Sequence, residues 1–203
     1  RTPQLGAFDP ENKLLARANL RRLEAEAVRD FILATTGNLN LIAGGASVPV
    51  TTDGEGKVVI GVQKIRDGLA AGVKGQMNAA FRRSAFIEVN RSLPLNMLVT
   101  FDLPEMKPNC DRRRSTTVVT QSLWFLNDDQ IIQLTNHLAD RLFAEFPEQQ
   151  SDRLHSLFLR LFATKPTIKE HRFVSEFLAH QEGFFKADQN PEWQKKLKAQ
   201  PEA

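Results

Sequence analysis

Residues 127–147, NDDQIIQLTNHLADRLFAEFP, carry the clearest helical pattern in the chain. Asn127, Asp128 and Asp129 supply capping oxygens and negative charge at the point where a helix would begin. The apolar residues that follow recur at the spacing of one helical face: Ile131, Leu134, Leu138 and Leu142. The pattern therefore predicts an amphipathic helix that ends at Pro147.

Two more helical segments follow within residues 150–182. Ser151 opens the first, and Lys165-Pro166 ends it. Thr167 and Glu170 have the spacing of a capping box, which predicts the start of the second. Both segments carry apolar residues at helical spacing: Leu154, Leu157, Phe158, Leu161 and Phe162, then Phe173, Val174, Phe177 and Leu178. Because only a few residues separate them, we expect an αα-hairpin.

The first third of the chain predicts one long helical stretch and one hairpin. The sequence DPE at residues 9–11 is typical of a helix start, and Gly37 of a helix stop, so we expect helix between them, to Thr36. Five apolar residues of this stretch share one face, which we expect to be buried: Leu20, Leu23, Ala27, Phe31 and Ala34. Residues 48–52 and 57–62 flank the turn sequence DGEG, which predicts a β-hairpin.

The middle of the chain gives weaker signals. Residues 64–83 have a helical pattern interrupted by three glycines, and residues 85–89 have the composition of a short strand. Residues 188–203 form a polar tail with the character of a short helix or a frayed end. The whole pattern predicts one domain over residues 1–203, mainly α with a small β-hairpin, an irregular helical domain that ends in an αα-hairpin.

Composition excludes several classes of protein. The 203 residues are 41% hydrophobic and 25% charged, as in ordinary globular domains. Their 27 basic and 24 acidic residues give a net charge of +3, which does not indicate a nucleic-acid binder. No apolar run is long enough to span a membrane. A single cysteine, Cys110, excludes an internal disulfide framework and a multi-cysteine metal site within the chain.

Asp30 is the candidate residue with the least expected position, because it falls within the apolar face of the first helix, with Glu26 at the edge of that face. A buried carboxylate needs a partner or a proton. We weigh three interpretations: a structural ion pair with an arginine from residues 82–114, which we favour; an acid pair that lines a pocket; and a face that is simply exposed.

Arginines concentrate in residues 81–114, and four of them are candidates for a charge network with Glu26 and Asp30: Arg82, Arg83, Arg91 and Arg113. Arginine holds carboxylates and phosphates by two-point hydrogen bonding. Intramolecular ion pairs are the favoured interpretation, ahead of an anionic ligand or glycan site and of nucleic acid. Cys110 lies beside three arginines, which would favour its thiolate, but we expect a packing role. The four histidines lack metal-ligand spacing, so we expect neither a metal nor a cofactor.

A series of short stretches, taken in order, resembles one family. They are residues 9–12 (DPEN), 21–30 (RRLEAEAVRD), 37–39 with 44–45, 82–84 (RRS), 91–95 (RSLPL), 101–104 (FDLP), Cys110 with Arg113, Thr116 and Thr117, then Gln121, 126–128 and 138–142 (LADRL). Together, over residues 9–182, they resemble the planctomycete surface domain of unknown function 1553. Residues 9–146 match its core.

The resemblance implies a context rather than a reaction. It implies that the chain is the C-terminal part of a large, exported, extracytoplasmic protein, of a kind that often carries a c-type cytochrome segment. The sequence CxxCH does not occur here, so we expect no haem in this chain. Its expected partners are the neighbouring domains of the same parent protein and polysaccharide, with no nucleic acid.

Two functions are open at this point. The favoured one is a non-catalytic binding or scaffolding module, because no catalytic constellation is visible. The alternative is part of a hydrolase acting on anionic polysaccharide, in which Glu26, Asp30 and the arginines line a cleft. A closed, paired network of these charges would support the module, whereas convergence of both acids and several arginines on an open pocket would support the hydrolase.

Overall fold

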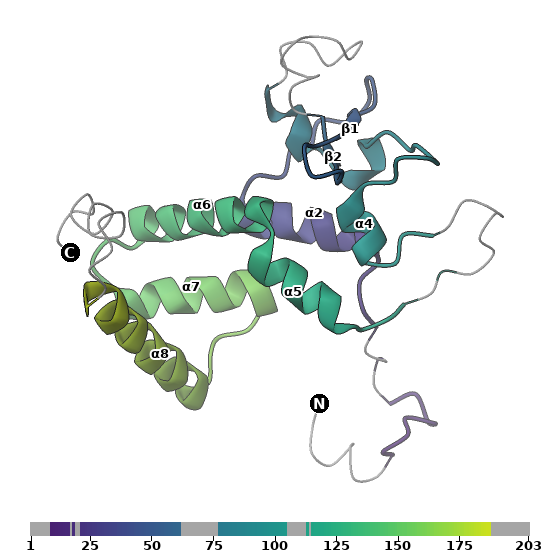
Figure 1. Cartoon of the computed structure of the whole chain (residues 1–203). Coiled ribbons are helices and arrows are strands. Elements are labelled where there is room, and N and C mark those ends of the chain that lie inside the picture. The colour runs from purple at the N-terminus through teal and green to yellow at the C-terminus, as the bar shows by residue number, and fades with distance from the viewer. Residues whose placement is uncertain are drawn as a thin grey trace. The chain divides into compact units, whose positions relative to one another are not determined.

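The computed structural model describes residues 9–16, 18, 21–61, 77–104, 113 and 115–187, and these are mainly helical (Figure 1). Their elements, in chain order, are α2 (Ala25–Thr36), β1 (Val50–Thr52), β2 (Val58–Ile60), the 3-10 helices η1 (Met77–Phe81) and η2 (Ser84–Phe86), α4 (Asn96–Thr100), α5 (Val119–Asn127), α6 (Asp129–Glu145), α7 (Gln150–Phe162) and α8 (Ile168–Ala187). The expected fold class, mainly α with one β-hairpin and packed C-terminal helices, is confirmed. Among the described helices, none has the length and apolar character needed to cross a membrane.

The chain groups into two compact units. The first unit comprises residues 1–32 and 39–124, and the second comprises residues 33–38 and 125–203. Helices α2 and α5 each contribute residues to both units. The domain boundaries expected from the sequence stay a prediction, and we describe each unit by itself.

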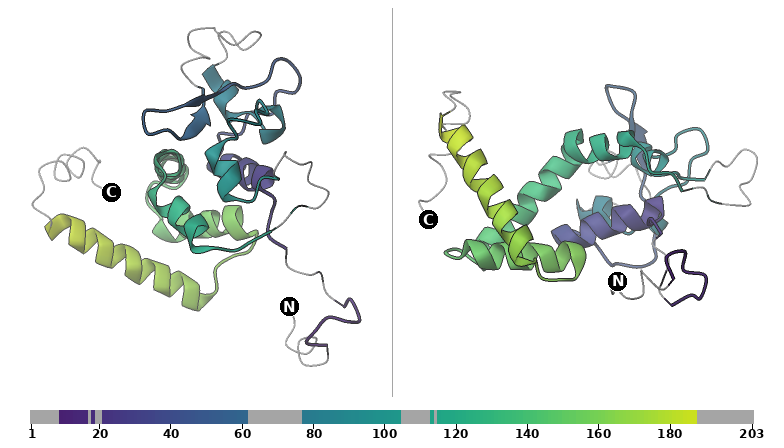
Figure 2. Two further views of the ribbon diagram at one scale, coloured as in Figure 1. Left: turned by 45° about the vertical axis from the view of Figure 1, so that its right-hand side comes forward. Right: turned by 90° about the horizontal axis from the view of Figure 1, so that it is seen from below.

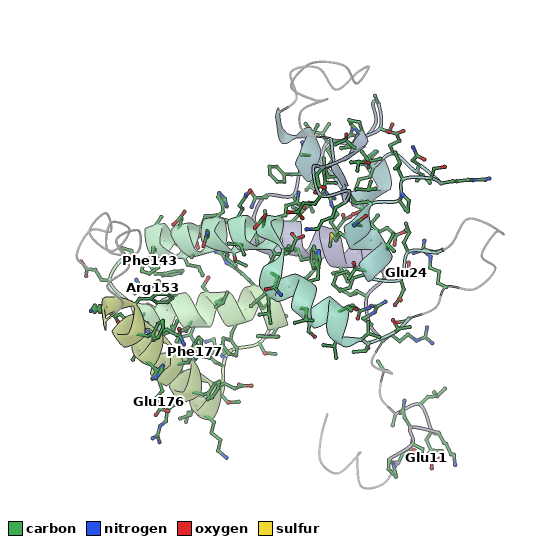
Figure 3. The ribbon with its side chains drawn as sticks, viewed as in Figure 1. Glu11, Glu24, Phe143, Arg153, Glu176 and Phe177 are labelled. Atoms are coloured by element: carbon green, nitrogen blue, oxygen red, sulfur yellow. The ribbon has the colours of Figure 1, made fainter. Side chains whose placement is uncertain are left out.

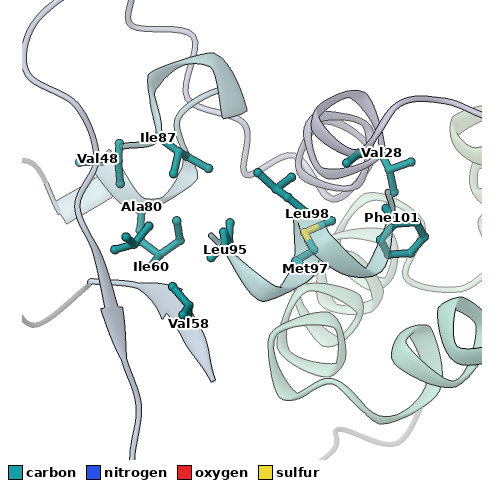
Figure 4. Packing of buried hydrophobic residues seen from close by; sticks show 13 residues of the cluster. Val28, Val48, Val58, Ile60, Ala80, Ile87, Leu95, Met97, Leu98 and Phe101 are labelled. Atoms are coloured by element: carbon teal, nitrogen blue, oxygen red, sulfur yellow. The ribbon is translucent and has the colours of Figure 1, made fainter. Parts of the chain in front are cut away.

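The first unit has its own hydrophobic core, drawn from short elements far apart in sequence (Figure 4). Helix α2 contributes Ala25 and Val28, the hairpin region contributes Val48, Val50, Val58 and Ile60, and α4 with its flanks contributes Leu95, Met97, Leu98 and Phe101. Trp124 packs on this core, with its ring edge-on to Phe101 at 5.4 Å between centroids. Burial of these side chains provides the main favourable free energy for folding of this unit.

The β-hairpin forms where the sequence predicts it. Strands β1 and β2 pair antiparallel, with Val50 opposite Ile60. Asp53 fixes the turn, because its Oδ1 accepts hydrogen bonds from the backbone N–H groups of Glu55 (3.0 Å) and Lys57 (2.8 Å). Gly56 completes the turn at φ +83°, a value that glycine adopts without strain.

The prediction that the first helix begins near Asp9 is wrong, because the helix begins at Ala25. The described residues before Ala25 form turns, and α2 is the only helix among the described residues up to Gly37. Asn12 and Leu15 have φ values of 55° and 54°, which a right-handed helix cannot contain. Asp9 accepts from the N–H groups of Lys13 and Leu14, both at 2.9 Å, and so closes this turn instead of capping a helix.

The expected strand at residues 85–89 is also wrong. Residues Ser84–Phe86 form a 3-10 turn, and Ile87 makes only an isolated parallel bridge with Val48. Two backbone hydrogen bonds accompany this bridge. The N–H of Val48 donates to the carbonyl of Phe86 (2.7 Å), and the N–H of Glu88 donates to the carbonyl of Val48 (2.8 Å). Of the helix expected over residues 64–83, residues 64–76 lie outside the described residues, and the described end is the 3-10 helix η1.

Helix α2 buries the side opposite to the one expected. Leu23 is 49% exposed and Phe31 is 41% exposed, whereas Ala25, Val28 and Arg29 are buried. At 100° per residue, these buried positions lie about 120–180° around the helix from Ala34, an exposed member of the expected face. The amphipathic pattern was misleading here because the core-facing side contains an arginine, which a count of apolar residues assigns to solvent.

The second unit is built on α6 and α7, which pack against each other (Figure 2). All four residues of the expected α6 stripe are buried: Ile131, Leu134, Leu138 and Leu142. Asp128 caps α6 by accepting from the N–H of Gln130 at 3.0 Å and of Ile131 at 3.3 Å. Arg153 of α7 lies over the ring of Phe143 at 4.4 Å (Figure 3), and Arg160 of α7 pairs with Glu145 of α6.

Helix α8 follows α7 as the second arm of the expected αα-hairpin. The capping box forms as expected, because Glu170 accepts from the N–H of Thr167 at 2.7 Å and Thr167 Oγ1 accepts from the N–H of Glu170 at 3.3 Å. Between α7 and α8, Ser151 Oγ lies 3.1 Å from His171 Nε2. From Ile168 to Lys186, no residue of α8 is buried.

Candidate functional site

The six expected site residues all belong to the first unit. Helix α2 presents Glu26 and Asp30 one helical turn apart, and the charge of Asp30 acts to raise the pKa of Glu26. The structure therefore places these two acids within electrostatic range of each other. The arginines divide into those that contact the two acids and those that do not.

Asp30 joins α2 to the segment after η1. Its Oδ1 accepts from both the backbone N–H and the hydroxyl of Ser84, each at 2.7 Å. Its Oδ2 lies 3.4 Å from Nε of Arg83, one of the arginines expected as a partner. The side chain of Asp30 is only 19% exposed, and Nη1 of the preceding residue, Arg29, also lies 3.9 Å from its Oδ1. This arrangement anchors a helix to a loop.

Glu26 forms a two-point ion pair with Arg113. The guanidinium nitrogens Nη1 and Nη2 lie 2.8 and 3.1 Å from the two carboxylate oxygens, and Nη1 also lies 3.0 Å from Glu24. Burial raises the pKa of Glu26, but the hydrogen bond and the charge of Arg113 outweigh burial, so the net shift of the pKa is downward. Glu26 is thereby held ionised and paired.

The other two expected arginines do not contact either acid. Arg82 is buried and donates to the main-chain carbonyls of Ala46 (2.9 Å) and Gly44, while its guanidinium lies 4.2 Å from the ring centre of Phe86. It fixes the loop before β1, so of the arginines expected as alternative partners of Asp30, the one that contacts it is Arg83. Arg91 is exposed and has no ion pair within the described part of the chain.

Sequence reasoning missed Arg29. This side chain is buried, and it donates to the carbonyls of Ala80 (2.7 Å) and Arg82 (2.8 Å) and, at 3.3 Å, to the hydroxyl of Ser84. Burial disfavours the charge and lowers the pKa of Arg29 to about 10, although the nearby Asp30 acts to raise it. The sequence signal for its burial was its position on the helix, next to Val28 and one turn after Ala25, both of which are buried.

A second cluster missed from the sequence surrounds Asp102. This residue has φ of 64°, and its carboxylate accepts from the N–H (2.7 Å) and the hydroxyl (2.8 Å) of Thr116. Arg22 pairs with the same carboxylate and donates to the carbonyl of Phe101 at 3.1 Å. Burial raises the pKa of Asp102, but the bonds from Thr116 and the charge of Arg22 together lower it. Aspartate tolerates a left-handed backbone, which was the only local signal.

The arrangement as a whole is that of interlocked structural contacts. Glu26, Asp30 and Asp102 each accept hydrogen bonds or ion pairs from at least two donor atoms. The described residues include no group of three or more His, Cys, Asp or Glu side chains that could hold a metal ion. His155 and His171 have ring centres 5.7 Å apart in the second unit. Cys110 lies outside the described residues.

Comparison with known proteins places the chain in a family without assigning it a reaction. Neither the curated proteins nor the solved structures contain a significant match. The family model PSD1, described as a protein of unknown function (DUF1553), matches residues 1–178. That range includes the whole first unit, with both charge clusters, and most of the described second unit. The chain therefore belongs to the PSD1 (DUF1553) family.

Proposed function

We propose that this chain is a non-catalytic binding or scaffolding module of a large extracytoplasmic multidomain protein. The observation that carries the proposal is the closed pairing of the charged residues on α2. Glu26 is held by Arg113 and Asp30 is held by Ser84 and Arg83. Every one of these contacts connects segments of the chain that are far apart in sequence.

A catalytic acid or base needs a proton that it can exchange with a substrate. Asp30 accepts two hydrogen bonds at 2.7 Å from one serine, so a substrate would have to displace them. Glu26 has its pKa lowered by Arg113, which disfavours the protonated form that a general acid requires. Both features support a structural role for the two acids.

The context we propose follows the resemblance to the planctomycete surface domain. In it, the parent protein is exported and associated with a c-type cytochrome segment, and this module contacts neighbouring domains of the parent. Polysaccharide is the ligand class that we propose outside the parent protein. The family membership supports this context only at the level of a shared domain of unknown function.

The experiment compares binding with hydrolysis on the same ligands. The chain is titrated with a neutral glucan, polygalacturonate and a sulfated galactan, and each mixture is assayed for newly formed reducing ends. Binding without hydrolysis supports the module. Hydrolysis that is abolished in both Glu26→Gln and Asp30→Asn, while the folded fraction stays unchanged, would overturn it in favour of a hydrolase of anionic polysaccharide.

A further inference from the structure

Two histidines from different helices lie side by side in the second unit. His155 of α7 and His171 of α8 have ring centres 5.7 Å apart, with their ring planes tilted by 43°. Ser151, one turn before His155 on α7, has its Oγ 3.1 Å from Nε2 of His171. We call Ser151, His155 and His171 the histidine cluster. It belongs to the second unit, whereas the charge network of α2 belongs to the first.

The histidine cluster has ring nitrogens available for a ligand. Within the described part of the chain, the contact with Ser151 is the one hydrogen bond of the His171 ring, and the ring of His155 has none. Both histidines are partly exposed, so an ion can reach them from solvent. Because Ser151 holds Nε2 of His171, the nitrogen of that ring left for a metal ion is Nδ1.

The separation of the two rings fits a shared metal ion. Zinc binds an imidazole nitrogen at about 2.0–2.1 Å, and that nitrogen lies about 1.2 Å from its ring centre, so each ring centre would lie about 3.2 Å from the ion. Two such rings are about 5.2 Å apart at a tetrahedral angle and about 6.4 Å apart on opposite sides of the ion. The observed 5.7 Å lies between these values, so the rings can share an ion by turning within their present separation.

We propose that His155 and His171 bind one divalent transition metal ion of the class Cu²⁺, Ni²⁺ or Zn²⁺. This inference does not rest on the proposed function. Imidazole suits these ions, with Cu²⁺ bound most tightly, whereas Ca²⁺ and Mg²⁺ require oxygen ligands. The described residues supply no third His, Cys, Asp or Glu to this pair, so water fills the remaining positions of the ion.

Spacing along the chain does not show this site. The expectation that the histidines bind no metal considered ligands on one helix, whereas α7 and α8 each supply one ligand here. The crossing of the two helices brings the ligands together, and the sequence gives no local signal for that crossing.

A metal ion at the histidine cluster would cross-link α7 and α8. From Ile168 to Lys186 no residue of α8 is buried, so its packing contributes little apolar burial. An ion bound by both rings in the folded chain stabilises that arrangement, because the unfolded chain does not hold the two rings together. We therefore expect the metal to protect α8 from local opening.

Ser151 is a positioning residue in this site. A histidine that ligates a metal normally donates its other ring N–H to a hydrogen-bond acceptor, which fixes the ring and its tautomer. The hydroxyl of Ser151 is in place to accept from Nε2 of His171. We expect Ser151→Ala to weaken metal binding about tenfold, and Ser151→Thr, which keeps the hydroxyl, to restore it. Equal affinity in Ser151→Ala and the unaltered chain would overturn this role.

The test titrates the untagged chain at about pH 7.5 with Cu²⁺, Ni²⁺, Zn²⁺ and Mg²⁺, and measures binding by calorimetry. We expect one ion per chain for the first three, most tightly for Cu²⁺, and no binding of Mg²⁺. His155→Ala and His171→Ala should each weaken Cu²⁺ binding at least about tenfold, since even the hydrogen-bond partner of a ligand is worth about 10–100-fold in affinity. His180→Ala is the matched control, because His180 is an exposed histidine of the same α8, and it should bind as the unaltered chain does.

Two further measurements identify the ligands and the cross-link. Electron paramagnetic resonance of the Cu²⁺ form should show two imidazole nitrogens, and one in either histidine variant. Zn²⁺ should slow amide hydrogen exchange in α8 of the unaltered chain but not of His171→Ala. Unchanged Cu²⁺ affinity in either histidine variant would overturn the proposal, as would an equal loss in His180→Ala. Binding that occurs only when two chains associate, as seen by analytical ultracentrifugation, would overturn it too.

Discussion

Arg29 and Arg82 use their guanidinium groups in the core of the first unit to bind main-chain carbonyl oxygens, and the nearest carboxylate to Arg29, that of Asp30, lies farther away at 3.9 Å. Between them they hold three short segments: η1, the turn after it, and the loop that carries Gly44. Such segments lack regular backbone pairing, and their buried carbonyls need donors. Arginine is suited to the task because one side chain offers five donors in a fixed geometry.

Replacement of Arg29 should destabilise the first unit strongly. Arg29→Met keeps the apolar stem but leaves the carbonyls of Ala80 and Arg82 without their donors. We expect a loss of about 3–5 kcal/mol in the free energy of unfolding. Urea unfolding measures it, with Arg91→Met as the control, since an exposed side chain should change stability by no more than about 0.5 kcal/mol. Equal midpoints in both variants would contradict a structural role for Arg29.

Asp30 should contribute less than a fully buried ion pair, because its carboxylate is partly exposed and its closest donors come from a serine. We expect Asp30→Ala to cost roughly 1.5–3 kcal/mol, the range for hydrogen bonds to a charged group. Ser84→Ala removes only the hydroxyl donor and should cost about 1 kcal/mol. The double variant should cost less than the sum of the two, because both remove the same bond. Strict additivity in chemical unfolding would argue against the contact.

Gly37 ends α2 in the second unit at φ +77°, where a Cβ atom would lie 1.5 Å from Nη1 of Arg141. That nitrogen donates to the carbonyl of Thr36 at 3.1 Å, so Gly37→Ala should lose this bond as well as strain the backbone. Gly56→Ala at φ +83° meets open space and should show the strain alone, about 1–2 kcal/mol. In thermal melts, the cost of Gly37→Ala should fall to that of Gly56→Ala once Arg141→Ala is present. A cost that Arg141→Ala leaves unchanged would exclude the clash.

Among the elements, α6 was the most predictable from sequence because local signals agree with its packing. Its cap, its apolar spacing and its proline stop all act within one segment. Helix α2 and the segment at residues 84–87 were predicted less well, because contacts distant in sequence determine them. The carbonyls bound by Arg29 lie more than 50 positions away, and the Ile87 bridge depends on Val48.

The cap of α6 gives a test at the scale of one element. Asp128 accepts two backbone N–H groups, whereas Asp129 is the first residue of the helix and acts there through its charge. We expect Asp128→Ala to cost about 1 kcal/mol, with a range of roughly 0.5–2. Asp129→Ala should cost less, about 0.3–1 kcal/mol, and its effect should shrink in high salt. Urea unfolding at low and high salt distinguishes the two, and a larger loss for Asp129→Ala would contradict the cap.

At the scale of the whole molecule, the candidate network was only partly accessible to sequence reasoning. The partners are brought together from distant positions, as with Arg22, Asp102 and Thr116 or with Glu26 and Arg113. The residue types alone indicated that the acids of α2 and the arginines of residues 81–114 would form ion pairs. Nothing local showed that Arg82 would turn to the loop at Gly44 while Arg83 turned to Asp30. That choice depends on tertiary packing.

The lowered pKa values of Asp102 and Glu26 make the stability of the molecule depend on pH at the acid end. A carboxylate whose pKa is lower in the folded than in the unfolded chain stabilises the fold above its unfolded pKa, near 4. That contribution disappears as the pH falls through the folded pKa. We therefore expect the free energy of unfolding to be nearly constant from about pH 6 to 7 and to decrease below about pH 5.

Asp102→Asn isolates the contribution of the Asp102 carboxylate, with its partners Arg22 and Thr116, to this pH dependence. Asparagine also tolerates a left-handed backbone and keeps the shape of the side chain. This variant should be less stable than the unaltered chain near pH 7, and the two curves of unfolding free energy against pH should converge towards pH 3. Asp140→Asn, an exposed position on α6, should run parallel to the unaltered chain. Urea unfolding at half-unit steps between pH 3 and 7 measures all three. Parallel curves for Asp102→Asn would show that Arg22 and Thr116 do not favour the ionised carboxylate, because only a pKa that differs between folded and unfolded chain can change the slope.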